Sequence, residues 1–359
     1  MPIDLTAAEN DDGRRLDRIL RKALPDMPLS AIHRLLRKGG VLVDGKKAAI
    51  DRRVKAGQTI TLPESIFQKE LNHVEPEVRV SQSKTCRTRG SRNTEKKQRT
   101  NQKLRGRSFF PDITLFEGAG LLVLNKPAGL PVHGRESLED LVRSYLEPKL
   151  SPSLSFKPGP LHRLDRPSSG IVAFSTSLEG ARFFSAMMRN RMIKKQYLAL
   201  VEGVIKEAEV WEDELVRDGR QKKSFRSVAK HGKAMFGISK PGETKTALTR
   251  VSPLAGDGER TLILAEIETG RTHQIRAQAA GRGHPLVGDR KYGGASDSGG
   301  EFFLHAWRME FPEKTDNNLY EGFPQGLPRL IVAPLPENFL EKIQKIFGKG
   351  IISDPLSQL

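Results

Sequence analysis

The stretch from Ser81 to Arg107 divides this chain, because its composition is that of a segment that does not fold by itself. Lysine and arginine dominate it, Glu95 is the only acidic residue that opposes them, and apolar residues are almost absent. Such a segment cannot bury enough apolar surface to offset its loss of conformational entropy. We therefore expect two folded parts joined by a basic flexible linker over residues 63–110.

The front part, residues 13–62, has the pattern of a small α/β domain. Apolar residues recur at helical spacing in two short stretches, Leu16, Ile19, Leu20, Ala23 and Leu29, Ile32, Leu35, Leu36. Gly39-Gly40 ends the second predicted helix, and Asp44-Gly45 is a hairpin-turn signal between short strand patterns, the last over residues 57–62. The polar face of the second helix is basic, with Arg34, Arg37 and Lys38. By itself, such a face is most often solvated surface.

In the second part, one carboxylate lies among three potentially cationic side chains, just before a predicted buried strand. His162, Arg163 and Arg166 flank Asp165, and the strand pattern is Ile171–Phe174. Nearby positive charge favours the ionised form of a carboxylate, so we expect Asp165 to be charged at neutral pH and available as a nucleophile or a base. An ion pair that only fixes a turn is the alternative.

Two later segments carry polar groups that could serve such a carboxylate. Residues 194–203 alternate like a strand and give Tyr197 an apolar setting with a polar tip. Residues 262–268 have a second strand pattern, which breaks at Thr269-Gly270. A short helix is predicted over residues 271–280, with Arg271 in its first turn.

A metal site is not predicted. Four histidines lie in or near these segments: His162, His273, His284 and His305. None has the close His-x-x-His or Cys-x-x-Cys spacing typical of zinc ligands. Structural hydrogen bonds around the site are the expected role for most of them.

The motifs L-H-R-L-D-R-P-S-S-G, K-K-Q-Y-L-A-L-V-E-G and G-R-T-H-Q-I-R, in this order, resemble those of the RluA family of RNA pseudouridine synthases. N-K-P-A-G-L-P-V-H upstream, with G-H-P-L-V-G-D and F-L-H-A-W downstream, extend the resemblance over residues 111–335. The departures are small. Pro167 and Ser168 replace an acidic residue and threonine, and Ala277-Gln278 replaces valine and histidine.

The resemblance implies that Asp165 is the catalytic aspartate, Tyr197 the active-site tyrosine, and Arg271 the arginine that pairs with the aspartate. It also implies isomerisation of uridine to pseudouridine, which involves no redox change or hydrolysis and needs neither cofactor nor metal. The carboxylate could attack the sugar or remove a sugar proton to start elimination, and the residues do not distinguish these routes. Tyr197 could stack on the base and help to remove the carbon 5 proton, although tyrosine, with a free pKa of ~10, is an inefficient base near neutrality.

RNA contacts are predicted at three places. Arg163 is the family's candidate for insertion where the target base flips out, and His162 and Arg166 lie beside it. The front domain resembles the small RNA-binding domain of ribosomal small-subunit protein four, which assigns RNA contacts to Arg34, Arg37 and Lys38. Residues 217–226, with Lys222 and Lys223, would suit a hairpin that grips RNA, although a solvated loop is the alternative.

The family implies an α+β fold, in which a mixed, mainly antiparallel central sheet with flanking helices forms a catalytic domain over residues 111–347. A small α/β RNA-binding domain precedes it, and residues 348–359 form a C-terminal tail. Residues 336–347 carry an apolar stripe and are predicted to be a packing helix. The basic linker would add nonspecific phosphate contacts; a plain tether and a nucleolar-type address are the alternatives.

Charge and composition favour a polyanionic partner. Sixty basic residues against 43 acidic ones give a formal charge of +17, clustered in segments. Cys86 is the only cysteine, and the start of the chain lacks a signal-peptide pattern, so a cytoplasmic protein is expected. No apolar run reaches the ~20 residues of a membrane span.

We therefore expect a monomeric pseudouridine synthase without a small-molecule cofactor that acts on ribosomal RNA, in the first place that of the large subunit. Two alternatives stay open at this point. A transfer-RNA pseudouridine synthase would share the catalytic motifs, and a noncatalytic ribosome-assembly factor would use the front domain to hold RNA. A protein that only binds RNA would need none of Asp165, Tyr197 and Arg271, which argues against the second alternative.

Overall fold

A computed structural model describes residues 2–64, 109–150, 153–218, 223–226, 244–295, 302–313 and 324–348. The chain divides into two compact units. The first comprises residues 1–112, 143–158 and 176–179, and the second comprises 113–142, 159–175 and 180–359. The predicted basic segment 81–107 and the tail beyond residue 348 lie outside the described residues, so the expectations for them stay predictions.

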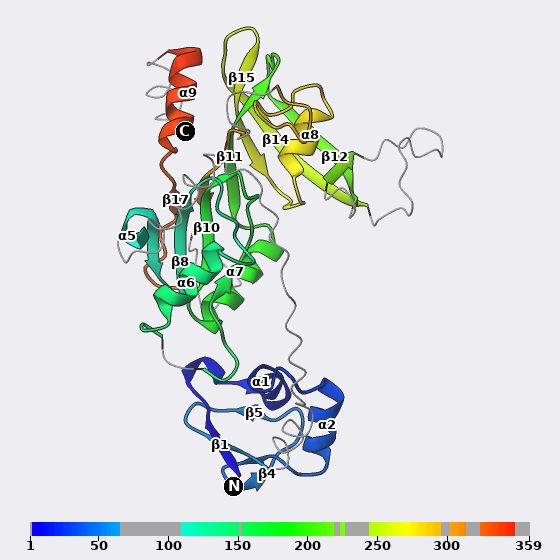
Figure 1. Cartoon of the computed structure of the whole chain (residues 1–359), viewed down its shortest axis with the longest axis vertical. Helices are drawn as coiled ribbons and strands as arrows, with labels where there is room; N and C mark the ends of the chain where they lie inside the picture. Colours follow the sequence, from blue (N-terminus) through cyan, green and yellow to red (C-terminus); the bar gives the residue numbers. More distant parts are fainter. Residues whose placement is uncertain are drawn as a thin grey trace, which may run out of the picture. The chain divides into compact units, whose positions relative to one another are not determined.

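The first unit has the two predicted short helices with short strands after them, and two further strands precede the helices (Figure 1). Its helices are α1 (Leu16–Ala23) and α2 (Leu29–Arg37). Its strands are β1 (Ile3–Thr6), β2 (Arg14–Arg15), β3 (Leu42–Val43), β4 (Lys46–Lys47), β5 (Arg53–Val54) and β6 (Thr59–Leu62). Within the described residues, four strands form a sheet in the order β1-β6-β3-β4, and β2 pairs with β5.

A compact apolar core explains why these helices form. Leu16, Ile19 and Leu20 of α1 are fully buried against Ile32 and Leu36 of α2, with Val43, Val54 and Ile60 from the strands. The segment from Ser153 to Phe156 also belongs to this unit, because the buried Asp11 carboxylate accepts hydrogen bonds from the amides of Leu154 and Ser155 at 3.0 Å. Leu154 packs against the same core.

The second unit is built on one large sheet, and the expected mixed, mainly antiparallel arrangement is confirmed. Among the described residues, nine strands follow the order β13-β12-β14-β15-β11-β16-β10-β8-β7, with β17 on β16 and β9 on β10. The β10–β16 pair is parallel and the other pairs are antiparallel. The strands are β7 (Thr114–Gly118), β8 (Leu121–Lys126), β9 (Gly159–Pro160), β10 (Ser169–Ser175), β11 (Lys194–Glu202), β12 (Glu209–Asp218), β13 (Lys223–Arg226), β14 (Lys245–Gly256), β15 (Arg260–Ile267), β16 (Leu304–Glu310) and β17 (Leu330–Val332).

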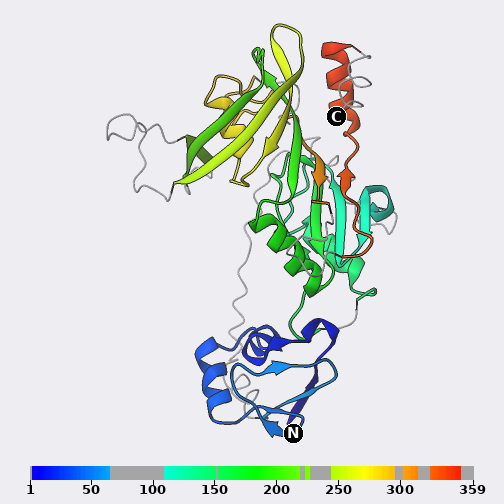
Figure 2. The same cartoon turned by 180° about the vertical axis from the view of Figure 1, so that it is seen from behind.

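Helices accompany this sheet at several points of the chain. They are α5 (Phe109–Ile113), α6 (Leu138–Leu146), α7 (Leu178–Arg189), α8 (Gln274–Ala280) and α9 (Glu337–Phe347). α8 lies on one face of the part formed by β12, β14 and β15, and the view from behind shows those strands in front of it (Figure 2). The predicted packing helix is confirmed as α9, whose Phe339 and Ile343 are buried against Leu198, Leu262 and Trp307.

The junction of β10 and β16 fixes the start of the strand that follows Asp165. Gly170 pairs with Ala306 across this junction and has a φ of 106°. A Cβ atom at Gly170 would lie 2.2 Å from the backbone oxygen of Ala306. Only glycine therefore allows this approach of the two strands, and the loop that carries Asp165 leaves the sheet at a defined point.

Candidate active site

Asp165 lies in the loop between β9 and β10, and two hydrogen bonds hold this loop to a neighbouring loop. The amide of Gly129 donates to the carbonyl of Arg166 at 2.8 Å, and Nε of Arg166 donates back to the carbonyl of Gly129 at 2.9 Å. The amide of Ser168 closes a turn on the carbonyl of Asp165 at 3.1 Å. The loop is thus shaped by backbone contacts, and the side chain of Asp165 is left to other partners.

A buried lysine, Lys126, also binds the backbone of these two loops. Lys126, at the end of β8, has a fully buried side chain (0% exposed), and its Nζ donates to the carbonyls of Pro127, Leu130 and Arg166 at 2.9, 2.9 and 3.2 Å. Burial lowers its pKa to about 7, opposed by the charge of Asp165 and assisted by that of Arg166. We had not predicted a role for Lys126, although it lies in the N-K-P motif.

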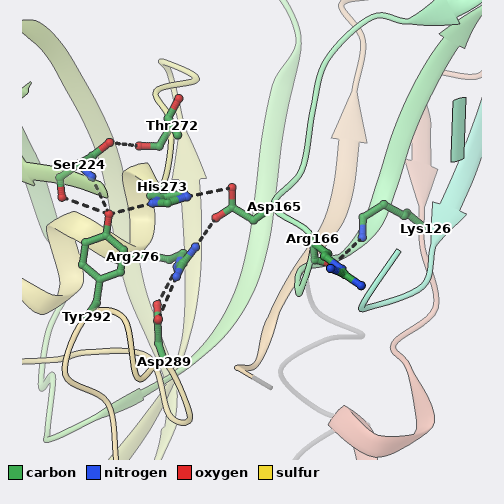
Figure 3. A network of polar contacts seen from close by, with 9 residues as sticks. All are labelled: Lys126, Asp165, Arg166, Ser224, Thr272, His273, Arg276, Asp289 and Tyr292. Atoms are coloured by element: carbon green, nitrogen blue, oxygen red, sulfur yellow. Dashed lines mark hydrogen bonds and ion pairs between the residues drawn. The ribbon is translucent and has the colours of Figure 1, made fainter. Parts of the chain in front are cut away.

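The arginine that contacts Asp165 is Arg276 of α8, so the expected pairing with Arg271 is wrong. Nη1 of Arg276 lies 2.7 Å from Oδ2 of Asp165 (Figure 3). Its Nε and Nη2 bind the buried Asp289 at 2.7 and 2.9 Å, and its guanidinium lies 4.3 Å from the ring centre of Phe302. Hydrogen bonds to both carboxylates, with their charges, raise the pKa of Arg276 despite the opposing effect of burial.

The start of α8 explains this correction. The predicted helix included Arg271 in its first turn, but α8 begins at Gln274 and the residue before it, His273, has a left-handed backbone with φ 55°. Arg271 therefore lies outside the helix, and its Nε donates to the carbonyl of Thr246 at 2.9 Å. Arg276 lies on the buried face of α8, with 5% of its surface exposed.

Tyr197 lies on β11, as predicted, and is buried. Its neighbours across the sheet are Ala265 on β15 and Ala306 on β16. Burial, followed by the nearby charge of Asp165, raises the pKa of its hydroxyl well above the ordinary value of 10.0. The hydroxyl is therefore protonated at neutral pH, so Tyr197 is poorly suited to remove a proton as a tyrosinate.

His273 joins Asp165 to a second cluster of polar groups. Its Nε2 lies 3.7 Å from Oδ1 of Asp165, and its Nδ1 lies 2.9 Å from the hydroxyl of Tyr292. Tyr292 in turn contacts the backbone of Ser224 on β13, and its ring lies 4.9 Å from the guanidinium carbon of Arg276 (Figure 3). The sequence predicted only a structural role for His273 and none for Tyr292.

Asp165 lines a cavity of about 540 Å³. Its lining includes the cationic residues Arg163, Arg166, Arg276, Arg290 and Lys291, together with His133 and His273. Its lining also includes the apolar residues Val132, Leu164 and Phe302. A cavity that combines positive charge with apolar surface suits a planar base with a neighbouring phosphate.

The three expected RNA contacts around Asp165 have different surroundings. Arg163 and Arg166 are exposed and line the cavity. His162 does not line it; its Nε2 accepts a hydrogen bond from the amide of Ala173 at 3.1 Å, and its ring stacks on Phe184. Burial, with a smaller effect of Lys195, lowers its pKa to about 3. The ring of His162 is thus engaged within the fold, and the RNA contact expected for it stays a prediction.

The other residues with predicted RNA contacts are not among those that line this cavity. Arg34, Arg37 and Lys38 are exposed at the end of α2 in the first unit. Lys223 begins β13, which pairs with β12 as the expected hairpin, and its Nζ lies 4.7 Å from the ring centre of Tyr292. Lys222 lies outside the described residues.

Neither a metal site nor a membrane-spanning helix is found in the part of the chain that the structure describes. No group of three or more histidine, cysteine, aspartate or glutamate side chains there could hold a metal ion. No helix among the described residues has the length and apolar character needed to cross a membrane.

Comparison with known proteins places this arrangement in a family. The family model described as RNA pseudouridylate synthase matches residues 120–281, and the S4 domain model matches residues 14–60. A protein of Vibrio vulnificus (strain CMCP6), "Ribosomal large subunit pseudouridine synthase C", is 30% identical over 345 residues, which cover 94% of both chains. The chain belongs to the RNA pseudouridylate synthase family. It is an RNA pseudouridine synthase with an S4 domain at its front.

Other relatives agree with this assignment. The protein of the same name from Escherichia coli (strain K12) is 28% identical over 350 residues, and the match covers 94% of each chain. Among solved structures, "Human RNA Pseudouridylate Synthase Domain Containing 4" aligns with a TM-score of 0.54 and 21% identity, over 70% of this chain and 97% of that one. This structural likeness supports the fold.

Proposed function

We propose that this protein isomerises specific uridines of large-subunit ribosomal RNA to pseudouridine, with Asp165 as the catalytic carboxylate. One observation carries the assignment of the residue. Asp165 lines a cavity whose lining includes five cationic residues, and Arg276 holds one of its oxygens at 2.7 Å. The substrate class is supported by relatives named for the large ribosomal subunit, which match this chain over 94% of its length.

The isomerisation breaks the bond between the sugar and uracil nitrogen 1 and forms a bond between the same sugar carbon and uracil carbon 5. The carbon 5 proton is then lost, and a nitrogen of the ring gains one. Two routes use the same carboxylate, which either attacks carbon 1′ or removes the proton from carbon 2′. In both routes Arg276 orients Asp165, because it binds Oδ2 and leaves Oδ1 to the substrate.

Tyr197 serves this reaction through its ring and its neutral hydroxyl. Because burial and Asp165 raise its pKa, it keeps its proton throughout the working range of pH. We assign it to contact and orientation of the base rather than to unaided removal of the carbon 5 proton.

The RNA reaches this site through exposed cations. Arg163 lines the cavity and has the planar side chain that can replace a flipped base in the stack while it contacts phosphate. Arg166 lines the same cavity. We assign Arg34, Arg37 and Lys38 of the S4 domain to contacts with the RNA backbone. We also infer that the protein is cytoplasmic, since Cys86 is the only cysteine and no disulfide within the chain can form.

Mapping of pseudouridines across total RNA tests this function directly. Deletion of the gene should remove pseudouridine at defined positions of large-subunit ribosomal RNA, and the parent protein should restore them. Asp165→Asn should fail to restore them while it still binds RNA, because the change removes the reactive charge and keeps the shape. Asp257→Asn, which alters an exposed turn carboxylate of the same unit, is the matched control and should restore modification.

Each contrary outcome has its own meaning. Pseudouridines that disappear only from transfer RNA would overturn the ribosomal substrate and keep the chemistry. An unchanged pseudouridine map would overturn the activity in this organism. Full restoration by Asp165→Asn would overturn the catalytic assignment.

A further inference from the structure

His273 lines the cavity and lies between Asp165 and the hydroxyl of Tyr292. The hydrogen bond to Tyr292 can determine which nitrogen of the imidazole carries the proton. It precedes α8 with a φ of 55°, a conformation that few side chains adopt and that directs its ring toward Asp165 (Figure 3). Nε2 lies 3.7 Å from Oδ1 of Asp165, just beyond hydrogen-bond distance. Nδ1 lies 2.9 Å from the hydroxyl of Tyr292.

The hydroxyl of Tyr292 has one proton and two acceptors within reach. The amide of Ser224 donates to this oxygen at 2.9 Å, so the oxygen already accepts one hydrogen bond. Its own proton can go to the carbonyl of Ser224, at 3.1 Å, or to Nδ1 of His273, at 2.9 Å. The first choice requires a proton on Nδ1 of the neutral imidazole, and the second requires a proton on Nε2.

The charge of Asp165 decides between these two arrangements. Oδ2 is bound to Arg276, so Oδ1 is the oxygen that faces His273. With the proton on Nδ1, a lone pair on Nε2 would face a carboxylate oxygen, and two acceptors would repel each other. With the proton on Nε2, the N–H points at Oδ1, and the shorter of the two hydrogen bonds of Tyr292 is made.

The surroundings also keep the imidazole neutral. Burial lowers the pKa of His273 to about 4; Asp165 and Asp289 oppose this shift, and Arg276 and Lys291 add to it. A neutral ring with its proton on Nε2 can donate to the carboxylate without neutralising it. The reactive form of Asp165 is thereby preserved.

We propose that His273 is a positioning residue for Asp165, that its Nε2–H closes onto Oδ1 when uridine fills the cavity, and that Tyr292 selects the required tautomer. Arg276 and His273 would then hold the two carboxylate oxygens from two directions, so that the plane of the carboxylate is fixed while Oδ1 keeps a lone pair for the sugar. This inference rests on the proposed role of Asp165. Contacts of this kind often shorten only when the substrate is bound.

A purely structural role predicts different behaviour. If His273 only connected α8 to the loop of Tyr292, its replacement would lower stability and leave kcat unchanged in the folded protein. If it positions Asp165, kcat falls while KM for RNA changes little, since the exposed cations that bind RNA are untouched.

Three variants separate the two roles in steady-state assays, which give kcat and KM, on a uridine-containing RNA substrate. His273→Ala should lower kcat on the order of 10- to 100-fold, because a misplaced reacting group costs about this much. His273→Gln should recover part of this activity, since its amide can place an N–H near the position of Nε2. Tyr292→Phe should be more active than His273→Ala, because it removes the hydroxyl and keeps the ring beside Arg276.

The tautomer itself can be measured without activity. In full-length protein with ¹⁵N-labelled histidine, the signal absent from His273→Gln identifies His273, and it should show a protonated Nε2 and an unprotonated Nδ1. In Tyr292→Phe the proportion with a protonated Nδ1 should rise. Thermal melting confirms that each variant is folded.

Two results would overturn the proposal: a proton on Nδ1 of His273 in the parent protein, or folded His273→Ala with the parent kcat. The proposed function would fail differently, through an active Asp165→Asn. Because the NMR result does not depend on turnover, the two failures are distinguishable.

Discussion

The helices α2 and α8 both carry arginine, and they place it in opposite environments. Arg34 and Arg37 of α2 are exposed at the end of a helix in the S4 domain. Arg276 of α8 is buried between Asp165 and Asp289, with the ring of Phe302 over its guanidinium. The residue type is the same, but the surroundings differ, and we propose that the arginines of α2 attract RNA while Arg276 fixes the geometry around Asp165.

The physical difference is the amount of solvent around each charge. An exposed arginine acts through a field that salt screens, so its contribution to RNA binding depends on ionic strength. A buried arginine that binds two carboxylates is held in one orientation, and salt reaches it poorly. Changes at α8 should therefore act on kcat and stability, whereas changes at α2 should act on affinity and its salt dependence.

The largest effect is expected for Arg276→Ala. Removal of this guanidinium leaves the buried carboxylate of Asp289 and the partly buried carboxylate of Asp165 without their cation, and breaking a buried ion pair typically costs about 3–5 kcal/mol of stability. Activity should disappear, because Asp165 no longer has the partner that orients it. Denaturant unfolding and single-turnover assays measure the two effects.

Arg276→Lys and Arg271→Ala make the result specific. Arg276→Lys keeps the charge but lacks the planar fork that binds both carboxylates, so it should fold with strongly reduced kcat. Arg271→Ala, in the same motif, should have a much smaller effect, since it removes one hydrogen bond to the carbonyl of Thr246. If Arg276→Lys were active and Arg271→Ala inactive, the result would favour Arg271, rather than Arg276, as the arginine that serves Asp165.

Asp289→Asn should have the next largest effect. It keeps the shape of a buried side chain that binds Nε and Nη2 of Arg276, and it removes the charge. The guanidinium should shift, and a displacement of a reacting group by about 1 Å can cost roughly 10²-fold in rate. Steady-state kinetics should show this as a fall in kcat with little change in KM. A rise in KM with an unchanged kcat would mean that Asp289 acts in RNA binding instead.

Tyr197→Phe should lower kcat less, by about tenfold, because the ring is retained and the hydroxyl acts in its neutral form. The shape of the pH profile tests this role. The raised pKa keeps the hydroxyl protonated below pH 10, so ionisation of Tyr197 adds no rise in rate between pH 7 and 9.5. The parent and Tyr197→Phe should therefore have pH–rate profiles of the same shape. A rise in rate at alkaline pH that occurs only in the parent would contradict a role for the neutral hydroxyl.

The smallest effect on turnover is expected from the combined variant Arg34→Ala, Arg37→Ala and Lys38→Ala. It should leave kcat on a short unpaired substrate unchanged and should weaken binding of structured RNA. Removal of each side chain that binds a phosphate should reduce the slope of log affinity against log salt by roughly 0.7–0.9. An unchanged slope in the folded variant would show that α2 does not bind RNA. Removal of residues 1–107 would be a less specific test, because it would also remove the apolar core against which Leu154 packs.

Much of the fold was predictable because its signals are local. The apolar spacing over Leu16–Ala23 predicts α1, the alternation over residues 194–203 predicts β11, and the stripe over residues 336–347 predicts α9. In each case the buried face has a period that short-range sequence displays. The extent of the sheet came only from the family resemblance, since the pairing of β10 with β16 joins segments more than a hundred residues apart.

The polar network around Asp165 was less predictable. Lys126 and Asp289 lie in motifs that support the resemblance, and Tyr292 follows the second of these motifs by three residues, yet no spacing between the three indicates that they meet. Lys126 reaches its three carbonyls because β8 ends beside the Asp165 loop, and Asp289 reaches Arg276 because α8 packs over the same cavity. Burial decides the roles of these groups, and burial depends on the assembled sheet.

The sequence by itself determined which chemical groups are available: a carboxylate at Asp165 in a shaped loop, a tyrosine on a buried strand, and two arginines five residues apart in one motif. Tertiary structure alone decided which arginine serves the carboxylate. Because α8 begins at Gln274, Arg276 lies on its buried face, whereas Arg271 precedes the helix and binds Thr246. The physical reason is that the direction of a side chain depends on where its helix begins and what covers it, and both are settled by long-range packing.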